Sequence, residues 1–528
     1  MSENRQQDRS GGAEQPGLGA RIRDFLLRAT NLMKGGGSEA LDRQRQRGKM
    51  TARERVDYLL DADTFLELDL FVEHTARDFG MDKKTLAGDG VITGYGRIGT
   101  RPVALFAQDF TVAGGSLGMM HAGKIVKVMD GARDRLIPLI GINDSGGARI
   151  QEGIDSLRGY GDIFYRNTLL SGVVPQLSVI LGPCAGGAVY SPALTDFVFV
   201  VDGVSNMFIT GPQVIKTVLG EEVTPEALGG AQVQATVTGN AHFYARSERE
   251  AFEQVTKLLS YLPANSRELP PAVHWKPPAR PITNDIIPEN RRTAYDVRDV
   301  IRGIVDESDF FEVQAGWARN IVIGFARLDG RTVGVVANQP RVLAGVLDVD
   351  SSDKAARFIR FCDAFNIPLI TFVDTPGYLP GVDQEHAGVI RHGAKILFAY
   401  SEATVPKLTV IMRKAYGGAY IAMCSRHLGA NFLYAWPTAE IAVMGPEGAA
   451  NIIFRREIAE SEDPEATRAE KVREYEEAFA NPYVGASKGY VDAIVEPEKT
   501  REALIRGLNL SRNREYGRIE RRHANIPL

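Results

Sequence analysis

The chain has 528 residues, of which 44% are hydrophobic, and carries a formal charge of −4 with a pI near 6.2. This length predicts two or more domains with ordinary cores, and the slightly acidic balance argues against nucleic acid as the main partner. The three cysteines form no CxxC pair, which excludes a zinc ribbon and a disulfide framework. No signal peptide and no 18-residue apolar run occurs, so we expect a cytoplasmic protein without a membrane span.

The N-terminal segment is polar at first and then reads as helical. Residues 1–20 are rich in glycine and polar side chains, and we expect them to be disordered. The helical pattern extends from residue 21 to about residue 60 and includes a basic stretch at residues 43–55. Such a stretch is usually a solvated helix face, but it can also bind the phosphates of a ligand. The sequence leaves both interpretations open.

Residues 96–212 and 326–446 read as two copies of one unit. Two segments match best, each given with its copy: Ile-Pro-Leu-Ile at 137–140 and 367–370, and Val-Pro-X-Leu-X-Val-Ile at 174–180 and 405–411. Each copy has the order strand, helix, strand, helix, strand, glycine turn and helix. Strands that alternate with helices predict right-handed crossovers in a layered α/β fold.

A proline-rich segment separates the two copies. Seven prolines lie between Leu262 and Pro288, so this segment cannot be a helix or a central strand. We place the domain boundary near residues 270–290. The predicted N-terminal domain is 21–275 and the predicted C-terminal domain is 276–528.

A glycine pair ends the third strand of each copy, at Gly186-Gly187-Ala188 and at Gly417-Gly418-Ala419. The first N–H groups of a helix have no intrahelical acceptor and lie at the positive end of the helix dipole. Glycine allows a ligand to approach the backbone closely, and two N–H groups directed at one oxygen form an oxyanion hole. Alternatively, the glycines only relieve crowding in a tight turn. The duplication favours two binding sites, and therefore two reactants.

Two further loops follow predicted strands in both copies. One is Asp144–Gly153, matched by 374–378, and the other is Gln108–Ser116, matched by 338–347. Ligands bind to open α/β sheets at the carboxyl ends of the strands. The structural alternatives are a helix cap at Asp144 or Ser145 and a plain loop–helix junction. The candidate substrate-binding residues of these loops are Gly114, Gly115, Gly146, Gly147 and Ala148.

Several catalytic signatures are absent from the sequence. It contains no GxxxxGK[ST] phosphate loop, no GxSxG elbow, no HExxH motif and no Met-Lys-Met biotin-attachment site. We therefore expect no metal site. The chemistry must depend on backbone donors and on groups that the ligands bring.

Eight ordered motifs resemble those of the carboxyltransferase (β) subunits of acyl-CoA carboxylases, close to the acetyl-CoA and propionyl-CoA enzymes. They extend from about Leu41 to Leu528 and read GKMTARERV, GDGVITGYGRIGTRPV, QDFTVAGGSL, DSGGARIQEG, GPCAGGAVYSPALTDF, VDTPGYLPG, RKAYGGAYIAM and AWPTAEIAVMGPEGA. The resemblance implies two tandem crotonase-like ββα-superhelix domains. It also implies a homohexamer, a ring of dimers, with each active site between the N-domain of one chain and the C-domain of another.

The reaction implied by the resemblance is carboxyl transfer from carboxybiotin to the α-carbon of a short acyl-CoA, giving malonyl-CoA or methylmalonyl-CoA. Biotin is carried on another polypeptide, the α subunit, where a biotin carboxylase charges it with ATP and bicarbonate. The biotin nitrogen left after loss of CO₂ takes the α-proton, so no side-chain base is needed. Gly186 and Gly187 would hold the thioester oxygen, and Gly418 and Ala419 the ureido oxygen of biotin. The assignment of each oxygen to its hole stays open.

Ile421 occupies the family position that helps to set acyl length. Propionyl-selective members tend to carry Asp there and members that accept acetyl-CoA tend to carry Ile, so we expect acetyl-CoA or both substrates. One pocket residue changes selectivity by only about 1–3 kcal/mol. By composition alone, Ile421 would be a core residue of its helix. Two alternatives remain: the carboxyltransferase subunit of a biotin-dependent acyl-CoA decarboxylase, and a non-catalytic scaffold subunit, which the glycine pairs disfavour.

Overall fold

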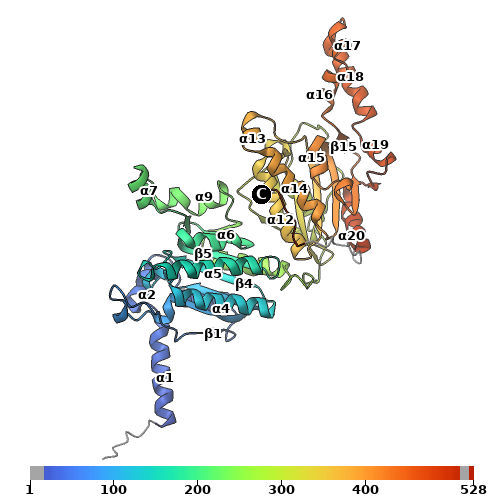
Figure 1. Ribbon diagram of the computed structural model, residues 1–528. Coiled ribbons are helices and arrows are strands. Elements are labelled where there is room, and N and C mark those ends of the chain that lie inside the picture. Colours follow the sequence, from blue (N-terminus) through green and yellow to red (C-terminus); the bar gives the residue numbers. More distant parts are fainter. Residues whose placement is uncertain (1–16, 512–521) are drawn as a thin grey trace, which may run out of the picture.

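Two eight-stranded sheets, each with helices on both faces, make up most of the protein (Figure 1). The computed structural model describes residues 17–511 and 522–528. The expected disorder at residues 1–16 lies outside the described residues, and the expectation is wrong for the residues that follow, because a helix begins at Leu18. None of the described helices combines the length and the apolar composition needed to cross a lipid bilayer.

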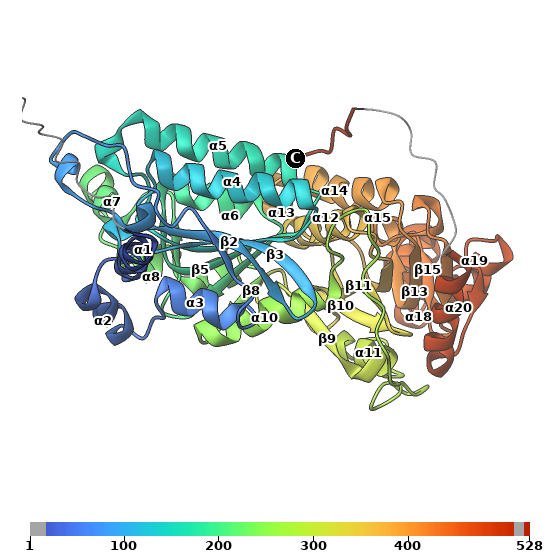
Figure 2. The ribbon, with the colours of Figure 1, turned by 90° about the horizontal axis from the view of Figure 1, so that it is seen from below.

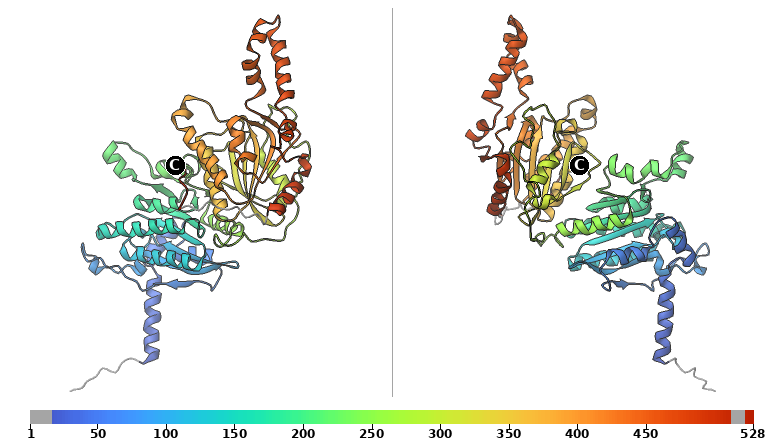
Figure 3. Two further views of the ribbon diagram at one scale, coloured as in Figure 1. Left: turned by 45° about the vertical axis from the view of Figure 1, so that its right-hand side comes forward. Right: turned by 180° about the vertical axis from the view of Figure 1, so that it is seen from behind.

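The N-terminal segment forms three helices instead of one continuous run. They are α1 (Leu18–Met33), α2 (Ser38–Gln46) and α3 (Ala52–Leu59). Left-handed backbone at Gly37 and Gly48 interrupts the helical pattern, with φ of +90° and +75°. Thr51 and Glu54 then start α3 with a capping box. In Figure 3, α1 projects from one end of the molecule.

The first sheet has the order β1-β2-β3-β4-β5-β6-β8, with β7 paired to the end of β5. Its strands are β1 (Leu66–Leu68), β2 (Val91–Ile98), β3 (Arg101–Gln108), β4 (Leu139–Ser145), β5 (Gln176–Ala185), β6 (Phe197–Val201), β7 (Asn206–Phe208) and β8 (Phe243–Ala245). The strands from β3 to β6 are parallel to one another. Their carboxyl ends therefore meet at one edge, where loops can bind a ligand.

Helices cover both faces of this sheet (Figure 2). One face carries α4 (Met119–Arg135) and α5 (Ile154–Leu170), and the other carries α3 and α10 (Glu248–Tyr261). Successive residues of a strand point to opposite faces. Leu105 accordingly packs on the α3 and α10 side, whereas Phe106 packs on the α4 and α5 side. The short helices α6 (Tyr190–Leu194), α7 (Pro212–Leu219), α8 (Pro225–Gly229) and α9 (Ala231–Thr236) follow β5 and β7 in the chain.

The second sheet repeats the first, in the order β16-β14-β13-β12-β11-β10-β9, with β15 paired to β13. Its strands are β9 (Phe310–Val313), β10 (Ile321–Leu328), β11 (Arg331–Asn338), β12 (Leu369–Thr375), β13 (Lys407–Tyr416), β14 (Phe432–Ala435), β15 (Glu440–Ala442) and β16 (Ala493–Ile494). Strands β10, β11 and β12 each begin 230 residues after β2, β3 and β4. Even the irregularity beside β4, between Asn143 and Ser145, recurs between Val373 and Thr375. The predicted internal repeat is confirmed.

The helices of the second half follow the same plan and add a projection. They are α11 (Val297–Ile304), α12 (Val349–Ala364), α13 (Val382–His386), α14 (Val389–Glu402), α15 (Gly417–Ala422), α16 (Pro446–Ile453), α17 (Arg455–Glu460), α18 (Pro464–Ala478), α19 (Pro482–Ser487) and α20 (Thr500–Ser511). The hairpin of α16 to α18 extends away from the sheet, at the opposite end of the molecule from α1 (Figure 3).

The two halves are joined by a segment without regular structure and by an aromatic contact. Residues 262–296, all of them described, contain no helix or strand, as the prolines predict. Phe197 of the first half packs edge-to-face against Phe361 of the second, with ring centroids 4.6 Å apart. Arg357 also donates a hydrogen bond to the carbonyl of Thr195 at 2.8 Å. The exact domain boundary stays a prediction.

Candidate active site

Each glycine pair lies where a buried strand turns directly into a helical turn. Strand β5 ends at Ala185 and a 3-10 turn, Gly186–Val189, leads into α6, while β13 runs without a gap into α15. Gly186 and Gly417 have φ of +62° and +57°, in the left-handed region that favours glycine. The N–H groups that begin each helical turn have no acceptor within the helix. They are available to an oxygen at the end of the strand.

The second glycine of each pair faces an aromatic ring, which lies closer in the first half than in the second. A Cβ at Gly187 would lie 3.1 Å from the ring of Tyr160, and a Cβ at Gly418 would lie 3.8 Å from the ring of Tyr378. Helix α5 supplies the ring of Tyr160 in the first half, and the loop after β12 supplies the ring of Tyr378 in the second. A side chain at Gly418 fits the folded chain but would occupy the space above the turn.

The structure brings all five predicted loop residues together beside the first glycine turn. The N–H of Gly146 donates to the carbonyl of Gly114 at 2.9 Å. Gly147 has φ of +101°, and a Cβ there would lie 2.9 Å from the carbonyl of Ala185. A Cβ at Gly115 would lie 2.2 Å from the carbonyl oxygen of Asp144. Ala148 forms a parallel β-bridge with Leu117. The second half repeats this bridge between Leu347 and Tyr378.

Of the two structural alternatives for these loops, the structure contradicts the helix cap and agrees with the loop–helix junction. Asp144 and Ser145 belong to β4, and α5 begins nine residues later at Ile154 with Gly153 as its N-cap. The helix-cap interpretation is therefore wrong. The loop after β3 does lead into a helix, because α4 begins at Met119. The N–H of Met119 donates a hydrogen bond to Glu152.

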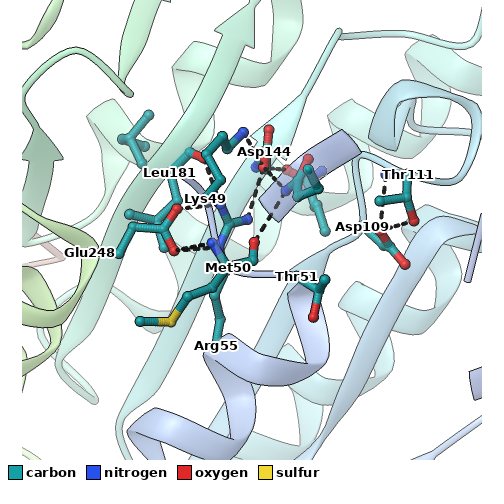
Figure 4. A network of polar contacts seen from close by, with 12 residues as sticks. Lys49, Met50, Thr51, Arg55, Asp109, Thr111, Asp144, Leu181 and Glu248 are labelled. Atoms are coloured by element: carbon teal, nitrogen blue, oxygen red, sulfur yellow. Dashed lines mark hydrogen bonds and ion pairs between the residues drawn. The ribbon is translucent and has the colours of Figure 1, made fainter. Parts of the chain in front are cut away.

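A buried network of charges lies at the carboxyl end of β4 (Figure 4). Oδ2 of Asp144 accepts hydrogen bonds from Arg55 Nη1 at 2.8 Å and from Lys49 Nζ at 2.7 Å. Arg55 also forms a bidentate ion pair with Glu248, in which Nη2 donates to Oε1 at 2.7 Å and Nε donates to Oε2 at 3.0 Å. Its Nη2 donates in addition to the carbonyl of Leu181. The side chains of Arg55 and Asp144 are fully buried. The network fastens the N-terminal segment to the sheet.

Sequence reasoning missed this network. Arg55 lies in the basic stretch that was expected to be either a solvated face or a phosphate site, and both interpretations are wrong for this residue. The usable signal is its position, because Arg55 shares one face of α3 with the buried Ala52, Val56 and Leu59. A charged residue on an apolar helix face predicts a buried partner of opposite charge.

Asp374 occupies the same place in the second half and is held by other donors. Its Oδ2 accepts from Arg413 Nε and from the Tyr295 hydroxyl, both at 2.9 Å, and its Oδ1 accepts from the N–H of Lys414 at 3.2 Å. Burial, together with the charge of Asp374, raises the pKa of Tyr295 well above its ordinary value. The hydroxyl therefore remains a donor at neutral pH.

Two titratable groups beside the glycine turns, Tyr378 and Cys184, are held in their protonated forms. Burial raises the pKa of Tyr378 to about 12, and it raises the pKa of Cys184, two residues before Gly186, to about 12 as well. A general base works best with a pKa near the operating pH, so neither group is suited to that role. Within residues 17–511 and 522–528, no group of three or more His, Cys, Asp or Glu is placed to hold a metal ion.

Ile421 lies in α15 and is 41% exposed in the single chain. The interpretation of Ile421 as a core residue of its helix is therefore wrong. Ala419 and Ala422 are the buried residues of this helix. Ile421 is free to line a pocket or to contact another chain.

Comparison with known proteins agrees with this geometry. The model of the carboxyl transferase domain family matches residues 43–526. The chain is 57% identical to the propionyl-CoA carboxylase carboxyltransferase subunit of Haloferax mediterranei, with 96% of this chain and 99% of that protein covered. It is 54% identical to the methylmalonyl-CoA decarboxylase subunit alpha of Propionigenium modestum, with coverage of 96% and 99%.

A solved structure has the same fold. The transcarboxylase 12S crystal structure, a hexamer with methylmalonyl-CoA bound, superposes with a TM-score of 0.95 at 51% identity. The match covers 98% of this chain and all of that one. The chain therefore belongs to the carboxyl transferase domain family and is a carboxyltransferase subunit of the acyl-CoA carboxylase type. The expected tandem pair of crotonase-like α/β domains is confirmed.

Proposed function

We propose that this subunit transfers CO₂ from carboxybiotin to the α-carbon of a short acyl-CoA. The observation that carries the proposal is the 57% identity, over 99% of its length, to a propionyl-CoA carboxylase carboxyltransferase subunit. Biotin arrives on a separate carrier, the α subunit, and a biotin carboxylase consumes ATP and bicarbonate to charge it. The present chain supplies the transfer step.

The two glycine turns serve as the two oxyanion holes of this reaction. Gly186 and Gly187 stabilise the enolate oxygen of the thioester, and Gly418 and Ala419 stabilise the ureido oxygen of biotin. Each hole consists of N–H groups without intrahelical acceptors at the end of a buried strand. Loss of one such donor typically raises a barrier by about 2.7–4 kcal/mol. The α-proton passes to the biotin nitrogen, in keeping with the protonated state of the nearby Tyr378 and Cys184.

Two observations indicate the length of the acyl group that the enzyme accepts, and they point to different substrates. Relatives at 52–57% identity are named for propionyl-CoA or methylmalonyl-CoA, whereas Ile421 is the residue that the family associates with acetyl-CoA. We therefore propose propionyl-CoA as a substrate, giving methylmalonyl-CoA, with acetyl-CoA accepted beside it. The exposed position of Ile421 one turn beyond Gly418 is compatible with a role in this choice.

The assembly proposed is a homohexamer with active sites between chains. The transcarboxylase 12S structure is described as a hexamer. In this chain the two glycine turns lie at the edges of two different sheets, so neighbouring chains would complete each site. Exposed apolar residues of α13 and of α14, which contacts α15, supply contact surface for such a neighbour, among them Val382 and Ile390.

A second candidate function is the reverse transfer in an acyl-CoA decarboxylase. The 54% identity to a methylmalonyl-CoA decarboxylase subunit is the observation that supports it. Both directions of transfer use the same two oxyanion holes.

The test is a carboxylation assay with purified carboxylase and carrier subunits. Acetyl-, propionyl-, butyryl- and methylcrotonyl-CoA are compared as acceptors, and methylmalonyl-CoA is supplied with uncharged carrier to measure the reverse reaction. Carboxylation of propionyl-CoA at the highest kcat/KM supports the proposal. Transfer in neither direction by a folded hexamer would refute it.

A further inference from the structure

The basic stretch near the N-terminus is mostly neutralised within the chain. Each of its partnered arginines faces a carboxylate at 2.7 to 3.0 Å: Arg43 faces Glu39, Arg45 faces Asp42 and Glu54, Arg53 faces Glu67, and Arg55 faces Asp144 and Glu248. Of the two other cations in the stretch, Arg47 is exposed and Lys49 is half-buried beside Asp144. Lys49 differs from the partnered arginines in its position and in its remaining hydrogen-bonding capacity.

Lys49 lies at the carboxyl ends of three adjacent parallel strands. Its Nζ is 2.7 Å from Asp144 at the end of β4, and 5.4 Å from the ring centroid of Phe110, two residues after β3. A Cβ on Gly182 of β5 would come within 2.7 Å of the same nitrogen. This edge of an open α/β sheet is where ligands bind, and the predicted loop residues Gly114 and Gly146 meet at the same edge.

The ammonium of Lys49 has donors to spare and a path to solvent. It carries three N–H donors, and its contacts with the described residues account for one hydrogen bond, to Asp144. Its side chain is 12% exposed, whereas the neighbouring Arg55 is sealed from solvent. Figure 4 shows both cations converging on Asp144 from the N-terminal segment.

Comparison of the two repeats shows that Lys49 is specific to the first. In the second half, Arg413 of β13 holds the matching aspartate, Asp374. The residue that corresponds to Arg413 in β5 is Gly182, and the space of its side chain is taken by the Asp144 carboxylate, 1.9 Å from the Cβ position, and by Lys49 Nζ, 2.7 Å from it. In the second half the cation, Arg413, comes from a strand of the sheet. In the first half, which we assign to acyl-CoA, Lys49 takes its place and comes from a loop at the ligand-binding edge.

The same comparison explains why Asp144 can anchor this lysine. Lys414 of the second half donates its N–H to Oδ1 of Asp374, but the corresponding Pro183 has no N–H to donate. Oδ1 of Asp144 is buried and has no hydrogen-bond partner in the part of the chain that the structure describes. Asp144 therefore interacts through Oδ2 with its two cations, and its charge holds the Lys49 ammonium over the ring of Phe110.

We propose that Lys49, held by Asp144 and Phe110, binds an anionic group of the acyl-CoA at the first glycine-turn site. The proposal rests on the proposed function and deepens it. The anionic oxygen belongs either to a phosphate of coenzyme A or to the carboxylate that the acyl group carries after transfer. A hydrogen bond to a charged group contributes about 1.5–3 kcal/mol, which corresponds to roughly a tenfold to hundredfold change in affinity.

The test measures dissociation constants of the full-length hexamer and its Lys49→Met variant for four probes. Propionyl-CoA carries phosphates, methylmalonyl-pantetheine carries only a carboxylate, methylmalonyl-CoA carries both, and propionyl-pantetheine carries neither. We expect Lys49→Met to weaken at least one anionic probe tenfold or more and to leave propionyl-pantetheine unchanged. Loss on propionyl-CoA identifies a phosphate, and loss on methylmalonyl-pantetheine identifies the carboxylate.

Two outcomes overturn the proposal. Unchanged affinity for all four probes shows that Lys49 only neutralises Asp144, and an equal loss on propionyl-pantetheine shows a structural effect without anion recognition. Lys127→Met is the matched control, because Lys127 forms a surface pair with Asp69 at 2.7 Å. The double variant Lys49→Met/Asp144→Asn gives the same readout without leaving the carboxylates of Asp144 and Glu248 to share the single charge of Arg55, should the single variant not fold.

The wild-type enzyme separates this inference from the proposed function. Carboxyl transfer to propionyl-CoA by the wild-type complex with its carrier and carboxylase subunits is measured first. Absence of that activity in a folded complex counts against the proposed function. With wild-type activity present, the probe series decides on Lys49 alone.

Discussion

Asp144 and Asp374 illustrate how two copies of one unit solve the same local problem with different residues. Each aspartate ends a buried parallel strand, and each needs a cation because a buried unpaired carboxylate is costly. Asp374 takes its cation, Arg413, from the adjacent strand. Asp144 takes Arg55 and Lys49 from a segment that precedes the first sheet. The loop that carries Lys49 and helix α3, which carries Arg55, are therefore held against the carboxyl end of β4.

Removal of the Arg55 charge should destabilise the chain strongly. We expect Arg55→Met to lower the free energy of unfolding by about 3–5 kcal/mol, because it leaves Asp144 and Glu248 buried with one cation fewer than they need. Urea denaturation measures the change. Arg43→Met removes an exposed i,i+4 pair with Glu39 and should cost at most about 0.5 kcal/mol. Equal losses in the two variants would contradict the role of Arg55.

Gly418 should be required for transfer but not for folding. A Cβ at this position meets nothing closer than Tyr378 at 3.8 Å, so Gly418→Val fits the chain while its methyl groups fill the place of the ligand oxygen. We expect transfer to fall by at least about 10²-fold, in line with the loss of an oxyanion hole. Gly123→Val, at an unobstructed position of α4, is the control. Wild-type transfer by Gly418→Val would show that the second hole is assigned to the wrong residues.

At the scale of elements, local sequence patterns were sufficient to predict the strands that helices cover on both faces of a sheet. The Ile-Pro-Leu-Ile segments lead into β4 and β12, and the expected strand–helix order holds in both copies. Patterning failed where an interaction distant in sequence determines the structure. Residues 21–60 read as one helix, because the turns at Gly37 and Gly48 leave little trace in periodicity. Asp144 was considered a helix cap, because its partner Arg55 lies 89 residues away.

The end of β5 offers a prediction at this scale. A Cβ on Gly182 would lie 1.9 Å from Oδ1 of Asp144 and 2.7 Å from Nζ of Lys49. Gly182→Ala should therefore push apart β4, β5 and the loop that carries Lys49, at a cost of about 1–3 kcal/mol in unfolding free energy. Gly146→Ala, whose Cβ would have its nearest neighbour at 3.6 Å, should cost less than about 0.5 kcal/mol. Thermal melts of both variants decide whether the strand ends are as tightly closed as the distances indicate.

The whole molecule presents its two glycine turns on separate sheets that share one continuous core. The aromatic contacts of Phe197 with Phe325 and Phe361 fix the two halves against each other, and one cluster of buried residues extends through both. On α13 and on α14, which contacts α15, however, Val382 and Ile390 are 66% and 80% exposed. Such a surface next to a proposed ligand site is what a neighbouring chain would cover, and acyl selectivity would then depend on residues from two chains.

Ile421 provides the test of that arrangement. We expect Ile421→Asp to move the ratio of kcat/KM values from acetyl-CoA toward propionyl-CoA by roughly tenfold, within the range that one pocket residue controls. Because Ile421 is 41% exposed in the single chain, the new carboxylate should cost little stability before assembly. The assay compares both acyl-CoA substrates, with sedimentation and a thermal melt on the same preparations. Ile390→Asp, at a more exposed position near α15, controls for a change in assembly alone. A folded hexamer of Ile421→Asp with an unchanged ratio would exclude this residue from acyl selection, whereas loss of the hexamer in both variants would place Ile421 in the subunit contact.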